Sequence, residues 1–192
     1  MKKYKYSRIG TLAEQLAEAK IDQAIIDQIM KGGEDIRKKP GLEEKTDWFR
    51  RAMIKMDELL DIKTRIAVRE GCACHLGGQK ARACQKIVQE NETLEDRIKA
   101  VSNLKYICGS VIMKANGDII ACGNTDARYY RKCVCLPEAK EPLPITYCYC
   151  CGGHIKHHLQ TALGRKLDGT VVASALSSGG KHPCTFRFRL KE

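Results

Sequence analysis

Eleven cysteines and five histidines are the residues of this 192-residue chain whose types and spacing could do chemistry. Most fall into two clusters, and the first consists of Cys72, Cys74, His75 and Cys84. Thiolate sulfur and imidazole nitrogen are ligands that zinc prefers in proteins. The Cys-x-Cys spacing is tighter than in a standard zinc finger, although both thiols can reach one metal ion. The cluster predicts a metal site, and the competing interpretation is a glycine-packed loop with free thiols.

The second cluster is larger and lies in the last third of the chain. It consists of Cys133, Cys135, Cys148, Cys150, Cys151, His154 and Cys184. Cys148, Cys150 and Cys151 precede or begin an expected helix, whose N-terminus lowers the pKa of a nearby thiol. Thiolates of this kind bind soft metals. This cluster therefore predicts a second metal site, or one site on which both clusters converge.

Thiolates beside histidines also suit nucleophilic catalysis, in which a histidine serves as the base. In this alternative interpretation, Cys150 or Cys151 is the nucleophile of a cysteine-dependent hydrolase. His154 is then the base, because it lies about one turn further along the expected helix. His157 and His158 are expected to face solvent.

Composition limits the class of protein. Hydrophobic residues make up 43% of the chain and charged residues 30%, which excludes a disordered chain. No apolar run approaches the roughly 18 residues of a membrane span, and no apolar signal core follows the basic N-terminus. We therefore expect a cytoplasmic protein, in a compartment where disulfides are rare. The odd cysteine count also makes complete internal pairing impossible.

The net charge is +11, and residues 71–192 carry +8 of it. A basic cysteine-rich module can bind nucleic acid. Aromatic residues are only 6% of the chain, however, and the densest basic-aromatic patch is confined to residues 129–132. A basic pocket for an anionic small molecule explains the same charge, so we favour a small-molecule ligand over nucleic acid. The sequence leaves open whether the chain forms a homodimer.

The elements that must position these residues follow from hydrophobic periodicity. A helix capped by Thr11 and ended by Gly32-Gly33 is expected first, and further helices over 42–60, 79–90, 93–104 and 152–163. Extended segments are expected over 106–113, 118–122, 128–136, 145–150, 170–176 and 184–190. Asn116-Gly117 predicts a hairpin turn, and 137–144 a loop. The fold class is therefore α+β, with an N-terminal helical region (1–70) and a cysteine-rich α+β domain (71–192), or one compact unit of both.

The C-terminal half carries a resemblance. Its motifs are Tyr147-Cys148-Tyr149-Cys150-Cys151-Gly152-Gly153-His154 at a helix start, Ser178-Gly179-Gly180 after a strand, and Cys184-Thr185-Phe186-Arg187-Phe188 in the last strand. Over residues 105–191 this order resembles the 4-vinyl reductase (hydrocarbon-binding) domain. It is even more similar to related cysteine-rich bacterial and archaeal proteins described as aminothiazoline-carboxylate hydrolase-like.

The resemblance implies an antiparallel sheet covered by helices around a small-molecule pocket. Some members hold zinc through cysteines near the C-terminal hairpin, and Cys184 matches the one on the last strand. Leu176-Ser177 stands where the second cysteine is expected, so Cys148, Cys150 or Cys151 would have to replace it. The hydrolase-like relatives imply ring-opening hydrolysis of a cyclic amidine. We thus expect a zinc- and small-molecule-binding protein, or alternatively a cysteine-dependent hydrolase of a small cyclic amidine or amide.

Overall fold

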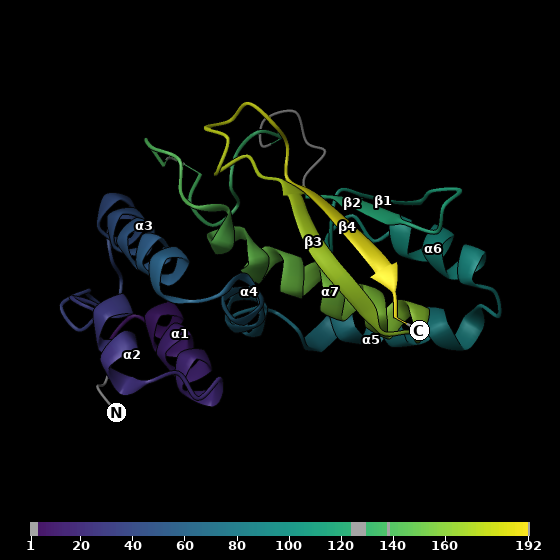
Figure 1. Cartoon of the computed structure of the whole chain (residues 1–192). Coiled ribbons are helices and arrows are strands. Elements are labelled where there is room, and N and C mark those ends of the chain that lie inside the picture. The colour runs from purple at the N-terminus through teal and green to yellow at the C-terminus, as the bar shows by residue number, and fades with distance from the viewer. Residues whose placement is uncertain (1–3, 124–129, 138, 192) are drawn as a thin grey trace.

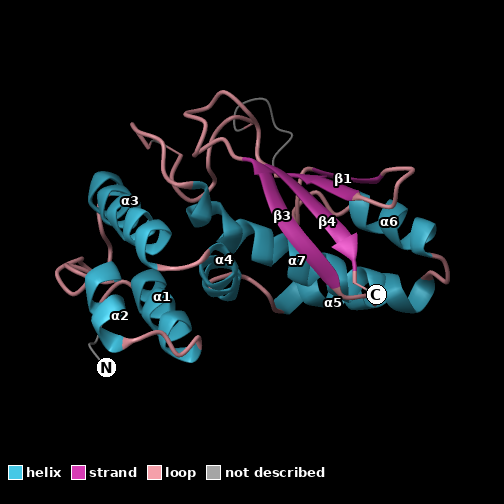
Figure 2. Cartoon of the chain, in the orientation of Figure 1, coloured by secondary structure: helices cyan, strands magenta, loops and turns pink. Residues whose placement is uncertain are grey.

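The computed structural model describes residues 4–123, 130–137 and 139–191, and these form the expected α+β fold (Figures 1 and 2). Seven α-helices occur in the described part: α1 Ser7–Glu18, α2 Gln23–Ile29, α3 Leu42–Leu59, α4 Ile62–Gly71, α5 Gly78–Glu90, α6 Leu94–Ser102 and α7 Tyr149–Leu163. One 3-10 helix, η1 Ile145–Cys148, precedes α7. The strands are β1 Ser110–Met113, β2 Ile119–Cys122, β3 Leu167–Ala173 and β4 Thr185–Leu190.

Helix α7 is the centre of the molecule. It packs against α4, α5 and α6 and against strand β3 of the sheet. The four strands form one antiparallel sheet in the order β1-β2-β4-β3. In Figure 1, α1, α2 and α3 gather at one end of α7 and the sheet lies beside its other half. None of the described helices combines the length and the apolar character that crossing a membrane requires.

Strand β4 shows why the sheet has a covered face. Phe186 and Phe188 are each 1% exposed, whereas the side chain of Arg189 is largely exposed to solvent. Phe186 pairs with Ala121, which is also fully buried. Successive side chains of a strand point to opposite faces, so the alternation in 185–190 directs the aromatic rings toward α7. The expected final strand is therefore confirmed.

Several other sequence predictions are confirmed. The helices expected over 42–60, 79–90 and 93–104 correspond to α3, α5 and α6, and Thr93 caps α6 by accepting a hydrogen bond from the backbone N–H of Asp96. The hairpin around Asn116-Gly117 joins β1 to β2, with Gly117 in the left-handed region at φ 81°. Residues 139–144 form neither helix nor strand.

The first helix was predicted with the wrong bounds. Helix α1 starts at Ser7, four residues before Thr11, whose hydroxyl donates to the carbonyl of Ser7 instead of capping the helix. The chain then breaks at Lys20, which has a φ of 57°. A new helix, α2, follows because the side chain of Asp22 accepts the backbone N–H of Ala24. One predicted helix is therefore two.

Helix α4 was not predicted. Asp61 caps it by accepting the backbone N–H groups of Lys63 and Thr64. Only Val68 and Arg69 of this helix are buried, so it lacks the apolar stripe by which amphipathic helices are recognised. The omission matters for function, because α4 carries the charged side chain of Arg69 into the interior.

Two expected extended segments are wrong. Residues 145–150 form η1 and the start of α7 instead of a strand, with Thr146 and Tyr147 buried and the Thr146 hydroxyl donating to Asp57. This strand prediction failed because the residue types favoured β structure, while tertiary contacts favour helix. Residues 130–136 contain no strand; residues 128 and 129 of that prediction lie outside the described part.

Gly153 lies inside α7, which begins at Tyr149, three residues before the start expected from the sequence. A Cβ atom at this position would be 2.5 Å from the backbone oxygen of Glu70. Glycine therefore allows the backbones of α4 and α7 to approach closely. The same continuous core contains buried residues of 1–70 and of 71–191, so the two expected regions share one interior.

Candidate functional site

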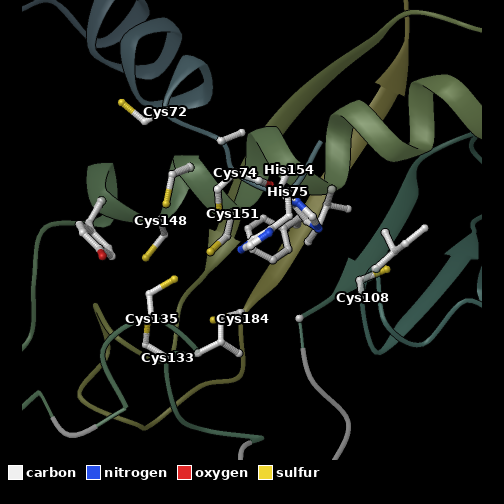
Figure 3. Close-up of a pocket in the computed structure, with 18 of the residues that line it drawn as sticks. Cys72, Cys74, His75, Cys108, Cys133, Cys135, Cys148, Cys151, His154 and Cys184 are labelled. Carbon is white, nitrogen blue, oxygen red and sulfur yellow. Dashed lines mark hydrogen bonds between the residues drawn. The ribbon is translucent and has the colours of Figure 1, made fainter. Parts of the chain in front are cut away.

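A cavity of about 720 Å³ lies where the start of α7 meets the end of α4, the start of β4 and residues 130–135. Nine of the eleven cysteines line it: Cys72, Cys74, Cys108, Cys133, Cys135, Cys148, Cys150, Cys151 and Cys184. His75 and His154 line it as well. Every predicted metal ligand except Cys84 therefore borders this one space. Figure 3 shows the labelled cysteines Cys135 and Cys151 with their sulfur atoms turned into this space.

Four of these cysteines form what we call the four-thiol group: Cys133, Cys135, Cys150 and Cys151. The pKa values of these thiols depend on one another: Cys133 and Cys151 shift the pKa of Cys135, and Cys151 shifts the pKa of Cys150. The group thus connects the 130–135 segment to the first turn of α7. Hydrogen bonds from Cys133 and Cys151 lower the pKa of Cys135 far below that of an ordinary thiol. A hydrogen bond from Cys151 likewise lowers the pKa of Cys150.

Two arginines stabilise these thiolates. Arg8 forms a hydrogen bond with Cys135, and its positive charge further lowers the pKa of that thiol. The positive charge of Arg69 lowers the pKa of Cys150. In return, the thiols more than offset the burial of Arg69 and raise the pKa of its guanidinium. The sequence suggested the helix N-terminus as the cause of lowered thiol pKa values, whereas the structure gives neighbouring thiols and two arginines as the causes.

Cys148 and Cys151 do not belong to the thiolates, contrary to expectation, because the pKa of each is raised. Burial raises the pKa of Cys148 to about 12, and its sulfur lies 2.8 Å from the hydroxyl oxygen of Ser174. Cys184 is also protonated at neutral pH, because burial raises the pKa of its thiol. Its sulfur accepts the backbone N–H of Ala175 at 3.4 Å. Both cysteines line the cavity, but Cys148 contacts a serine hydroxyl and Cys184 contacts a backbone amide.

The first predicted cluster is divided by the fold. Cys72 and Cys74 line the cavity, whereas Cys84 is fully buried in α5 and does not border it. The Cys84 sulfur lies 3.9 Å from Nδ1 of His158. Burial raises the pKa of Cys84 to about 11, so it remains a thiol. The prediction that Cys72, Cys74, His75 and Cys84 form one metal site is not supported by this arrangement.

Two histidines of α7 hold the loop formed by residues 72–77. The Nδ1–H of His154 donates to the carbonyl of Cys74 at 2.6 Å, and the Nε2–H of His158 donates to the carbonyl of His75 at 3.1 Å. His75 itself has a φ of 58° in the left-handed region. His158 is completely buried, so the expectation that it faces solvent is wrong. Because carbonyls only accept, Nδ1 of His158 is the acceptor for the Cys84 thiol.

His154 was predicted to be a metal ligand or a catalytic base. Its Nδ1 is engaged by the Cys74 carbonyl, which leaves the lone pair of Nε2 for either role. Burial lowers the pKa of His154, which keeps the imidazole neutral at neutral pH. In the described residues no three His, Cys, Asp or Glu side chains are yet arranged as metal ligands. Metal binding therefore requires the thiols to rotate toward a common point.

Arg8, Arg69 and His158 contribute to the site but were missed in the sequence. The two arginines stand outside both cysteine clusters, and nothing in their neighbouring residues distinguishes them from surface arginines. His158 shares a helix face with His154, which was a signal, but the polar type of the residue suggested exposure.

Comparisons of this chain with protein-family models, with curated proteins and with solved structures found no match.

Proposed function

We propose that this chain binds a soft divalent metal ion, with zinc favoured, through Cys133, Cys135, Cys150 and Cys151. We also propose that it binds a small molecule in the adjoining cavity. The observation that carries the proposal is that four cysteines from two separate segments line one cavity and shift one another's pKa values. Thiols become metal ligands when they lose their protons.

The chemistry of the donor set suits zinc. Four-cysteine zinc sites are common structural sites, and soft sulfur ligands discriminate against magnesium and calcium. Cys135 and Cys150 already have lowered pKa values, so only Cys133 and Cys151 have to lose protons that the free protein retains. When bound, the ion would cross-link the loop carrying Cys133 and Cys135 to the start of α7.

The surrounding charge supports the same assignment. A zinc ion with four thiolates carries a net charge of about −2. Arg8 and Arg69 flank the four-thiol group and supply the opposite charge in a buried setting. Because unpaired charges in the interior are costly, this pairing favours an anionic centre at this place.

A cysteine-dependent hydrolase remains the second candidate. The lowered pKa of Cys150 and the available Nε2 of His154 favour it. No contact between a cavity thiol and the His154 imidazole occurs among the described side chains, whereas catalytic pairs usually lie within hydrogen-bond reach. Metal binding is better supported because four thiols from two segments line the same cavity and shift one another's pKa values. A cytoplasmic location is part of the proposal, since all eleven cysteines are free thiols.

Elemental analysis of protein purified without chelator tests the metal proposal. We expect about one equivalent of zinc in the wild type and a loss of most of it in Cys135→Ser and Cys151→Ser. Cys122→Ser is the matched control, because Cys122 does not line the cavity. Wild-type protein that neither contains zinc nor binds added zinc would overturn the proposal, as would retention of full zinc content in both variants.

A further inference from the structure

The cavity is strongly electropositive. Five cationic side chains line it: Arg8, Arg69, Lys80, Lys105 and Lys132. No Asp or Glu occurs among its described lining residues. Cys135 and Cys150, whose thiol pKa values are lowered, offset only part of this charge, and a concave surface with an excess of one sign of charge concentrates the opposite ion. The charge of the lining therefore favours an anionic occupant.

Arg69 supplies an independent observation. Its side chain is only 3% exposed, yet its Nε has no hydrogen-bond partner among the described residues. One terminal nitrogen donates to the carbonyl of Tyr147 at 3.0 Å, and the guanidinium lies 5.0 Å from the centre of the Tyr147 ring. A buried donor without an acceptor carries a desolvation cost that a ligand oxygen would remove. The planar guanidinium is also suited to oxyanions.

The metal centre proposed above does not account for all of this charge. A four-thiolate zinc centre carries about −2, so it would balance two of the five cations. The other three charges would still leave the cavity positive. This remaining positive charge favours binding of a further anion.

The rest of the lining is apolar. Phe49, Ile107, Ile155 and Phe186 are all buried residues that border the cavity. A volume of about 720 Å³ lies within the range of small-molecule sites. A free inorganic ion would leave most of this apolar wall without a contact.

We propose that the cavity binds a small organic anion that combines an apolar body with an oxyanion group, and that Arg69 contacts the oxyanion. The inference rests on the small-molecule site proposed above and names the class of its ligand. Carboxylate, phosphate and sulfonate groups share the chemistry that Arg69 would recognise.

Two fluorescent probes test this directly. The first, 8-anilino-1-naphthalenesulfonate, has an apolar body and an oxyanion; the second, N-phenyl-1-naphthylamine, has the same ring system without the sulfonate. Each is titrated into full-length protein whose zinc content has been measured. We expect saturable binding of one sulfonate probe per chain, at least about tenfold tighter than the neutral probe.

Arg69→Gln should weaken binding of the sulfonate about tenfold or more and change binding of the neutral probe less than about twofold. Arg37→Gln is the matched control, since Arg37 is exposed and pairs with Glu44. If Arg69→Gln fails to fold, the double variant Lys80→Gln/Lys132→Gln replaces it, with an expected loss of about threefold or more for the sulfonate alone.

Equal affinity for the two probes, or an equal loss of both in the folded variant, would overturn the anion proposal. Zinc content distinguishes this failure from failure of the metal proposal. Zinc-loaded protein without sulfonate preference rejects only the anion. Zinc-free protein that still selects the sulfonate through Arg69 supports the anion and rejects the metal.

Discussion

The Nδ1 atom of His154 lies 2.6 Å from the carbonyl oxygen of Cys74, and so joins residues 80 positions apart. His158, one turn further along α7, makes the equivalent bond to His75. The two imidazoles fix the 72–77 loop at the border of the cavity, and they lie on the same helix that carries Cys150 in its first turn. These histidines therefore position the cysteine-lined wall through backbone contacts.

Replacing His158 with alanine tests this role. His158→Ala removes a fully buried ring, its bond to the His75 carbonyl and its contact with Cys84. We expect a loss of about 2–4 kcal/mol in the free energy of unfolding, measured by urea denaturation. His157→Ala is the control, because His157 is half-buried, and its loss should stay below about 1 kcal/mol. Equal losses in both variants would contradict the account.

The stability of the protein should depend on pH through the same residue. Burial lowers the pKa of His158 to about 4 from 6.5. Between these values the unfolded chain binds a proton at His158 that the folded chain does not bind. The free energy of unfolding should therefore fall as pH is lowered from 6.5 to 4, by up to about 3 kcal/mol.

Urea denaturation at several pH values measures this dependence, and His158→Phe serves as the comparison. The variant lacks the titrating group, so its stability should vary less across the same interval. An identical slope for variant and wild type would assign the dependence to other groups.

We expect alanine substitutions at the two glycines of α7 to change the free energy of unfolding in opposite directions. Gly153→Ala would place a Cβ atom 2.5 Å from the backbone oxygen of Glu70, so α4 and α7 must separate, at an expected cost of about 1–3 kcal/mol. At Gly152 the nearest atoms to a new Cβ are 3.7 Å away, in ordinary contact. Gly152→Ala should therefore raise the free energy of unfolding by up to about 1 kcal/mol, through helix propensity. Thermal or urea denaturation of both variants tests the close approach, which a neutral Gly153→Ala would refute.

Thiol reactivity should follow the pKa values. In metal-free protein at pH 7, Cys135 and Cys150 should react with iodoacetamide first, because hydrogen bonds from neighbouring thiols and two arginines favour their thiolates. Burial raises the pKa of Cys108 to about 12, so it should react at least about tenfold more slowly. Peptide mass spectrometry over time gives the order. Uniform labelling of all eleven thiols would contradict it.

Much of the fold was predictable, because most elements carry local signals. Thr93 marks the start of α6, Asn116-Gly117 the β1–β2 turn, and the alternation of Phe186 and Phe188 the last strand. Helix α4 has a capping residue in Asp61 but no apolar stripe, and residues 145–148 lack a helix signal. Their structure depends on contacts with α7 and with Asp57, which are distant in sequence.

The residue types of the candidate site were predictable from the sequence, but which of these residues lie together was not. Cysteine spacing suggested the cavity wall, and all but one of the predicted ligands border it. The spacing could not show that Cys84 turns into the core toward His158, because α5 and α7 meet only after folding. Nor could it show the burial of Arg69, an isolated charge in a polar helix.

X-ray absorption at the zinc edge is the most direct test of the proposed metal centre. For zinc-loaded protein we expect a shell of four sulfur atoms at about 2.3 Å, and a loss of sulfur from that shell in Cys135→Ser. A shell dominated by nitrogen or oxygen, or an unchanged spectrum in Cys135→Ser, would contradict the assignment of zinc to Cys133, Cys135, Cys150 and Cys151.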